Sequence, residues 1–194
     1  MASRNRKKLA ELRRVLDAAG ISRLTLLSLD DVPAFDEAPE TAATFEGNAV
    51  AKARDAFRAT GIAAVADDSG LEVDALNGMP GVLSARWAGG HGDDRANTDL
   101  LLAQMSDIPD DRRGAAFVSA CALVTGTGET VVRGTWPGRI AREPRGDGGF
   151  GYDPVFVAQG SSKTAAEMTP EEKDAVSHRG RALAALLPAL RALA

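Results

Sequence analysis

The sequence is poor in the residues that build disulfide frameworks and transition-metal sites. Its 194 residues include one cysteine, Cys121, and two histidines. A single cysteine excludes an internal disulfide and a cysteine-based zinc site, and it fits a reducing compartment. A composition of 44% hydrophobic and 26% charged residues is typical of a globular domain that needs no crosslinks. We therefore expect one domain over residues 1–194, with no separate linker.

Long hydrophobic runs are also missing. The first residues, MASRNRKKLAEL, carry charge but lack the apolar stretch of a signal peptide. The longest apolar run near the C-terminus, ALAALLPALRALA, is too short to span a bilayer and is interrupted by Pro188 and Arg191. We therefore expect a cytoplasmic protein with no membrane association.

An excess of positive charge is absent, because the net charge is -4. This argues against a dedicated nucleic-acid binder. The charges are nevertheless segregated: residues 4–14 hold six bases against one acid, Glu11, whereas residues 30–46 hold six acids and no base. Such segments fit a protein that handles an anion and a cation together, and fit two solvated faces equally well. Only five of the 23 basic residues are lysines, and a lysine ammonium meets a phosphate as a point charge.

Hydrophobic spacing predicts helices over residues 6–20, 44–61 and 94–105, and strands over 24–29 and 62–66. Two further apolar runs joined by GTGE predict a β-hairpin. A Thr169–Glu172 capping box begins a helical C-terminal region. Helices that alternate with strands, followed by a hairpin, indicate a mixed α/β sheet.

Chemistry-bearing residues gather where the predicted strand 62–66 ends, because Asp67, Asp68 and Ser69 follow it directly. Open α/β sheets bind ligands at strand ends, and two carboxylates there are costly unless they meet a cation or donors. The acidic loop around Glu40 can supply another oxygen, and hard oxygen donors favour Mg²⁺ over zinc. A polar turn is the alternative interpretation of the pair.

Two more polar groups lie on the first two predicted helices. The run Ser3 to Lys8 opens a helix, where free N–H groups and the helix dipole attract an anion; an ordinary cap with exposed lysines is the alternative. Asn48 and Lys52 share one face of the second helix, away from its apolar stripe. For Asn48 and Lys52, a solvated polar face without a functional role is the alternative interpretation.

Two late motifs have the residues to contact a purine. In GDGGFGYDP, glycines allow close approach of the backbone, and Phe150 and Tyr152 offer rings for stacking; a tight loop with core aromatics is the alternative. In the run SHRG, Arg179 can present paired donors to purine O6 and N7. For His178 the alternative is a helix-cap or core histidine.

Taken in order, these motifs resemble one family. The set is S-R-N-x-x-K, T-F-x-x-N-A-x-x-K-A, A-D-D-S-G-L-x-V-D-A-L, G-x-P-G-x-x-S-A-R, G-G-F-G-Y-D-P and S-H-R-G. It resembles the inosine triphosphate pyrophosphatases, also called non-standard purine NTP or dITP/XTP pyrophosphatases. The match runs from Ser3 to about Leu190.

The resemblance implies an α/β fold with a long twisted mixed β-sheet flanked by helices, and two lobes with an active-site cleft between them. It implies a homodimer with a nucleotide in that cleft. The implied activity is Mg²⁺-dependent hydrolysis of ITP, dITP and XTP to the monophosphate and pyrophosphate. A Maf-like pyrophosphatase for modified pyrimidine nucleotides and a non-catalytic nucleotide-binding module are the alternatives.

The resemblance also assigns site residues by motif. Glu40 and Asp68 match the metal ligands, and Asp68 matches the proton acceptor. We expect Lys52, with Lys8, to offset charge on the leaving pyrophosphate. As a hypothesis, Asp67 or a metal-bound hydroxide shares the work of the base. The residues expected to bind the substrate are Ser3, Arg4, Asn5, Arg6, Lys7, Lys8, Ser69, Phe150, Gly151, Tyr152, Asp153, Lys173, His178 and Arg179.

Overall fold

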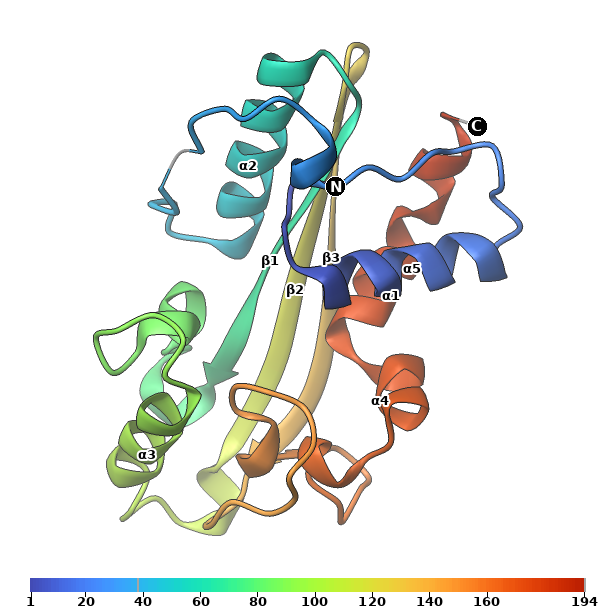
Figure 1. Ribbon diagram of the computed structural model, residues 1–194. Coiled ribbons are helices and arrows are strands. Elements are labelled where there is room, and N and C mark those ends of the chain that lie inside the picture. The colour runs from blue at the N-terminus through green and yellow to red at the C-terminus, as the bar shows by residue number, and fades with distance from the viewer. Residues whose placement is uncertain (38, 194) are drawn as a thin grey trace. The chain divides into compact units, whose positions relative to one another are not determined.

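The computed structural model describes residues 1–37 and 39–193 and has an α/β fold (Figure 1). The α-helices are α1 (Arg6–Ala18), α2 (Phe45–Thr60), α3 (Asp94–Gln104), α4 (Pro170–Val176) and α5 (His178–Arg191). The strands are β1 (Ala64–Val73), β2 (Gly114–Thr125), β3 (Gly128–Ile140) and β4 (Phe156–Ala158). The predicted α/β class is confirmed. None of the helices within the described residues is long and apolar enough to cross a membrane.

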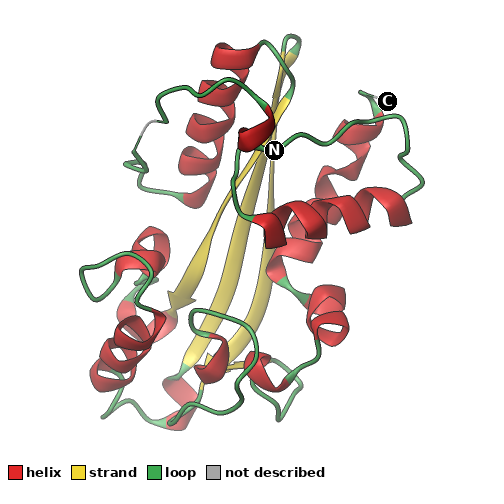
Figure 2. Cartoon of the chain, viewed as in Figure 1, coloured by secondary structure: helices red, strands yellow, loops and turns green. Residues whose placement is uncertain are grey.

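The strands, yellow in Figure 2, form one antiparallel sheet. Their order in the sheet is β1-β2-β3-β4. The predicted hairpin is present, with β2 and β3 separated by residues 126–127. Strand β4 pairs with the end of β3, where Gly138 lies opposite Ala158 and Ile140 opposite Phe156. Strand neighbours in the sheet are therefore also neighbours along the chain.

The chain divides into two compact units, each with its own apolar core. Unit 1 comprises Met1–Asp68, Ser119–Gly134 and Arg179–Ala194, and unit 2 comprises Ser69–Val118 and Thr135–His178. In unit 1 the core joins α1 and α5 to the strands through Leu12, Leu16, Val65, Leu123, Leu183 and Leu186. In unit 2 the core contains Leu71, Leu101, Phe117, Trp136, Tyr152 and Phe156.

The helices that carry predicted site residues begin where their caps place them. Asn5 caps α1, because its Oδ1 accepts the N–H groups of Lys7 (3.0 Å) and Lys8 (3.3 Å). Thr44 caps α2 by accepting the Gly47 N–H, and the helix ends at Gly61 with φ of 70°. Both starts follow the sequence prediction, and they fix which side chains of each helix face the sheet.

Strand β1 corrects the prediction that the strand ends at the two aspartates. It continues to Val73, so Asp67 and Asp68 lie in its middle. Successive side chains of a strand point to opposite faces. The two neighbouring carboxylates therefore have different surroundings, and each finds its own partners.

The strand predicted at residues 24–29 is also wrong. This segment is not part of the sheet, and its backbone meets the first residues of the chain instead: the Met1 amino group donates to Leu27 O (2.6 Å) and the Leu29 N–H to Ser3 O (3.4 Å). Beside it lies an apolar cavity of about 310 Å³ lined partly by Ile62–Val65. A strand needs a hydrogen-bonded neighbour along its length, and these few bonds do not supply one. The four-stranded sheet is antiparallel, which corrects the prediction of a mixed sheet.

Candidate active site

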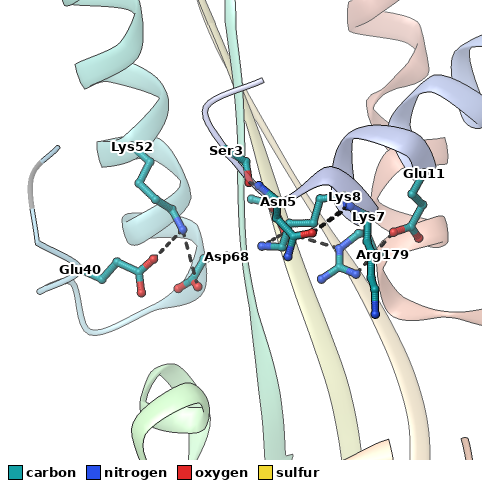
Figure 3. A network of polar contacts seen from close by, with 10 residues as sticks. Ser3, Asn5, Lys7, Lys8, Glu11, Glu40, Lys52, Asp68 and Arg179 are labelled. Atoms are coloured by element: carbon teal, nitrogen blue, oxygen red, sulfur yellow. Dashed lines mark hydrogen bonds and ion pairs between the residues drawn. The ribbon is translucent and has the colours of Figure 1, made fainter. Parts of the chain in front are cut away.

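Three of the predicted functional residues meet beside α2 in unit 1. Lys52 Nζ lies 2.8 Å from Glu40 Oε1 and 3.8 Å from Asp68 Oδ1. The other oxygen of Asp68, Oδ2, accepts a hydrogen bond from Asn48 Nδ2 at 2.9 Å. Figure 3 shows Glu40 and Asp68 turned toward the Lys52 ammonium from two sides. The structure thus brings together the two predicted metal ligands and the predicted catalytic lysine.

The carboxylates of Glu40 and Asp68 suit a magnesium ion that keeps several water ligands better than they suit a metal held by protein ligands alone. A cationic ammonium already lies between the carboxylates of Glu40 and Asp68, so both oxygens are aimed at a place that favours positive charge. Within residues 1–37 and 39–193, no group of three or more His, Cys, Asp or Glu side chains could hold a metal. Mg²⁺ is commonly bound by one or two carboxylates, with water and substrate phosphates completing its octahedron. Two carboxylates therefore suffice.

Asp67 belongs to a different charge network on the other face of β1. Lys8 Nζ lies 2.8 Å from Asp67 Oδ2, and Arg179 Nε lies 3.5 Å from the same oxygen. Arg179 is in turn 3.4 Å from Glu11 Oε2. Figure 3 shows Lys8, Glu11 and Arg179 around α1, apart from the Glu40, Lys52 and Asp68 group. The network ties α1 and α5 to the strand.

The electrostatics of this network set the charge state of Asp67. Burial raises the pKa of its carboxyl, but the positive charges of Lys8 and Arg179 outweigh burial, and the pKa falls to about 2. For Arg179, burial lowers the pKa, and the charges of Asp67 and Glu11 reverse the effect and raise it. A carboxylate with so low a pKa is a weak base near neutral pH. This favours an anchoring role for Asp67 over the hypothesis that it shares the work of the base.

The N-terminal run Ser3 to Lys8 is the predicted triphosphate segment. Ser3 Oγ accepts the Asn5 N–H at 3.1 Å, and Asn5 holds the first amides of α1. Arg4 pairs with Glu37 and with Asp30, whereas the side chains at 6 and 7 are exposed. The segment therefore presents several cations at a capped helix N-terminus, and Lys8 is turned toward Asp67.

In unit 2, a second group of predicted residues surrounds an exposed ring. Phe150 is 51% exposed, and its N–H donates to Asp153 Oδ2 at 2.8 Å. Lys173 pairs with Asp153 and places its Nζ 5.0 Å from the centre of the Phe150 ring. The Asp153 carboxylate thus holds both the backbone N–H of Phe150 and the Lys173 ammonium near the Phe150 ring. The exposed ring keeps an apolar face for stacking.

Two other predicted contacts lie in the core of unit 2. The Tyr152 hydroxyl donates to Ser84 O at 2.9 Å, and the ring is buried. The His178 ring stacks on Phe117, with centroids 5.0 Å apart, and on Trp136 at 6.4 Å. The structure therefore places both where the alternative interpretation, core aromatics and a core histidine, expects them.

The remaining predicted residues have mixed surroundings. The Gly151 N–H donates to Asp94 Oδ2 at 2.6 Å, and Ser69 is half-buried at the start of unit 2. Arg179 begins the last segment of unit 1 and is only 7% exposed. Its donors face the carboxylates of Asp67 and Glu11. This arrangement does not favour the predicted contact of Arg179 with purine O6 and N7.

Sequence reasoning missed two residues of these groups, Glu11 and Asp94. It did single out Asn48 with Lys52, but the alternative of a solvated face is wrong for Asn48, which is 1% exposed because the loop before α2 covers it. Glu11 was visible only as the single acid in a basic segment, which is the signal that could have found it. Asp94 had no signal beyond its place in the first turn of α3.

The buried thiol beside the Asp67 network gives a testable expectation. Burial raises the pKa of Cys121 to about 12, and the charge of Asp67 adds to the rise. Because the thiolate is the reactive form, the native protein should react with a disulfide reagent such as DTNB at least about a hundredfold more slowly than the unfolded chain at pH 8. Stopped-flow absorbance measurements of the DTNB reaction with and without guanidinium chloride test this, and equal rates would contradict the burial of Cys121.

Comparison with known proteins places the chain in a family. The model of the Ham1 family matches residues 1–189. The dITP/XTP pyrophosphatase of Mycobacterium tuberculosis (strain ATCC 25618 / H37Rv) is 77% identical over 194 residues, which cover 100% of this chain and 95% of that protein. The crystal structure of a nucleoside-triphosphatase / dITP/XTP pyrophosphatase from Mycobacterium abscessus aligns with a TM-score of 0.83 at 71% identity, over 97% of both chains. A Ham1 protein from Staphylococcus aureus aligns at 0.89 with 36% identity, over 100% of this chain and 97% of that one.

The α/β fold and the match of nearly the whole chain assign the protein to a single family. The chain belongs to the Ham1 family. The resemblance inferred from the six motifs is therefore confirmed, because relatives of this chain are named dITP/XTP pyrophosphatases.

Proposed function

We propose that the protein hydrolyses non-canonical purine nucleoside triphosphates, namely ITP, dITP and XTP, to the monophosphate and pyrophosphate. The observation that carries the proposal is the 77% identity, over the whole chain, to a protein named dITP/XTP pyrophosphatase. The grouping of Glu40, Lys52 and Asp68 supports it, because phosphoryl chemistry depends on charge neutralisation and positioning.

The proposed reaction is attack of water on the α-phosphorus, with pyrophosphate leaving. Glu40 and Asp68 would hold magnesium, which supplies neutralisation of phosphate charge when bound. Asp68 takes the proton of the attacking water, and Lys52 and Lys8 offset charge on the leaving group. The cationic start of α1 holds the triphosphate.

Selection of the base rests on residues of unit 2. Phe150 offers an exposed ring for stacking, with Lys173 held over it by Asp153. A site that donates a hydrogen bond to a 6-oxo group rejects adenine, because the amino group of adenine leaves the donor unpaired. The requirement for magnesium and the homodimer implied by the family resemblance belong to the same proposal.

The proposal predicts the substrate, the product and the metal requirement together. With magnesium, dITP and XTP should be hydrolysed with a kcat/KM at least about a hundredfold above that for ATP. The primary product should be pyrophosphate, and EDTA should abolish turnover. Chromatography of the nucleotides, with separate assays of pyrophosphate and orthophosphate, measures all three.

The same assay separates the alternatives. A preference for UTP or dTTP over dITP would indicate the Maf-like enzyme, and binding of dITP without turnover would indicate a nucleotide-binding module. Orthophosphate as the primary product would contradict the proposed bond cleavage.

A further inference from the structure

The side chain of Asn48 joins the loop that follows Glu40 to the carboxylate of Asp68 and is fully enclosed. It is 1% exposed on α2. Its Oδ1 accepts the Ala42 N–H at 2.9 Å, and its Nδ2 donates to Asp68 Oδ2 at 2.9 Å. An amide so deeply buried must satisfy its donors and acceptor within the protein, and both ends here meet elements of the proposed site.

The orientation of this amide follows from its partners. A backbone N–H can only donate, so the Ala42 N–H requires the carbonyl end of Asn48. The NH₂ end must therefore face the carboxylate of Asp68. The two bonds are mutually dependent, because turning the amide over would set two donors against each other and leave the carboxylate opposite an oxygen.

Each bond fixes one of the two predicted ligands. With Oδ2 of Asp68 held by Asn48, the other oxygen, Oδ1, is the one turned toward Lys52 at 3.8 Å. Ala42 lies two residues after Glu40, so its bond anchors the loop that carries that carboxylate. The loop also packs closely on α2, since a Cβ at Gly47 would lie 2.7 Å from Ala42 Cβ.

We propose that Asn48 is a positioning residue that sets the spacing and orientation of Glu40 and Asp68 for a divalent cation. It touches neither substrate nor metal, and it acts through the two ligands. This inference rests on the proposed function, because it assigns Asn48 a part in the same magnesium site. Residues that orient metal ligands in this way commonly change metal affinity by about 10- to 100-fold when replaced.

The chain offers a matched control in unit 2. Asn97 on α3 is 2% exposed, and its Oδ1 accepts the Ala88 N–H at 2.7 Å. Asn48→Ala and Asn97→Ala therefore each remove a buried amide that holds a loop N–H to a helix. Only the first removes a donor to Asp68, so a merely structural effect should appear in both variants alike.

The experiment measures metal binding directly as well as activity. Mn²⁺ is titrated into the wild type and both variants by electron paramagnetic resonance, and the magnesium concentration for half-maximal dITP hydrolysis is determined. Asn48→Ala should weaken Mn²⁺ binding and raise the magnesium requirement by at least about tenfold. Asn97→Ala should leave both unchanged. If Asn48→Ala does not fold, Asn48→Gln, which keeps the amide but displaces it, should show the same weakening.

The outcomes separate the two proposals. The positioning role is overturned if the Asn48 variants bind Mn²⁺ with wild-type affinity, or if Asn97→Ala loses as much affinity as they do. In either case, turnover of dITP by the wild type leaves the proposed function standing. A wild-type protein that hydrolyses no purine triphosphate, or that binds no Mn²⁺, overturns the proposed function and this inference with it.

Discussion

Asp68→Asn should lower kcat for dITP hydrolysis by about 10²- to 10⁴-fold, the range expected when a positioned proton acceptor is removed. The substitution also removes one of the two carboxylates on either side of Lys52. Steady-state release of pyrophosphate at saturating magnesium measures the effect. A variant with wild-type activity would remove Asp68 from the proposed mechanism.

The dependence of this loss on magnesium distinguishes the two roles proposed for Asp68. If the carboxylate acts chiefly as a ligand, activity of Asp68→Asn should recover substantially as magnesium is raised. If it acts chiefly as the proton acceptor, activity should stay low at every concentration. The folded state should be little affected, because an asparagine can still accept the Asn48 hydrogen bond, and thermal unfolding checks this.

Asp67→Asn should have the opposite profile, with its main effect on stability. Removing one partner of a buried ion pair leaves the others uncompensated and typically costs about 3–5 kcal/mol. We expect a loss near the lower end, about 3 kcal/mol, because Arg179 keeps its contact with Glu11. Urea unfolding at pH 7 measures the change in the free energy of unfolding, and a change as small as that of Asp68→Asn would contradict the anchoring role.

The pH dependence of this stabilisation has a definite sign. The pKa of Asp67 in the folded protein, about 2, lies below the value of about 3.9 for an unfolded chain. The unfolded state therefore binds the proton more readily, and the stabilisation is complete above pH 4 and lost as the pH falls from about 4 to about 2. The difference in stability between the wild type and Asp67→Asn should shrink over that window. A difference independent of pH would mean that the carboxylate charge is not its source.

Local rules account for the parts of the fold that the sequence predicted well. Helices α1 and α2 are capped by Asn5 and Thr44 and are followed by Gly20 and Gly61, each with φ of 70°. These boundaries depend on residues close in the chain, so the sequence contains the whole interaction. The strand at 24–29 failed for the opposite reason, since a strand exists only where a distant segment pairs with it.

The candidate site divides in the same way. The sequence by itself determined the family, through six ordered motifs, and excluded a cysteine-based zinc site through its single cysteine. It also singled out Glu40 and Asp68 as metal ligands and Lys52 as a catalytic residue, whereas their contact with one another came from the structure.

Only the tertiary structure decided what the two neighbouring aspartates do. Asp67 and Asp68 are identical in sequence terms, but a strand turns them to opposite faces. Asp68 meets Asn48, 20 residues away. Asp67 meets Arg179, which is itself paired with Glu11, 168 residues from it in the chain. Charge state, burial and orientation depend on such distant partners, and no local pattern specifies them. This is why the partners of Asn48 and Glu11 emerged only once the chain was folded.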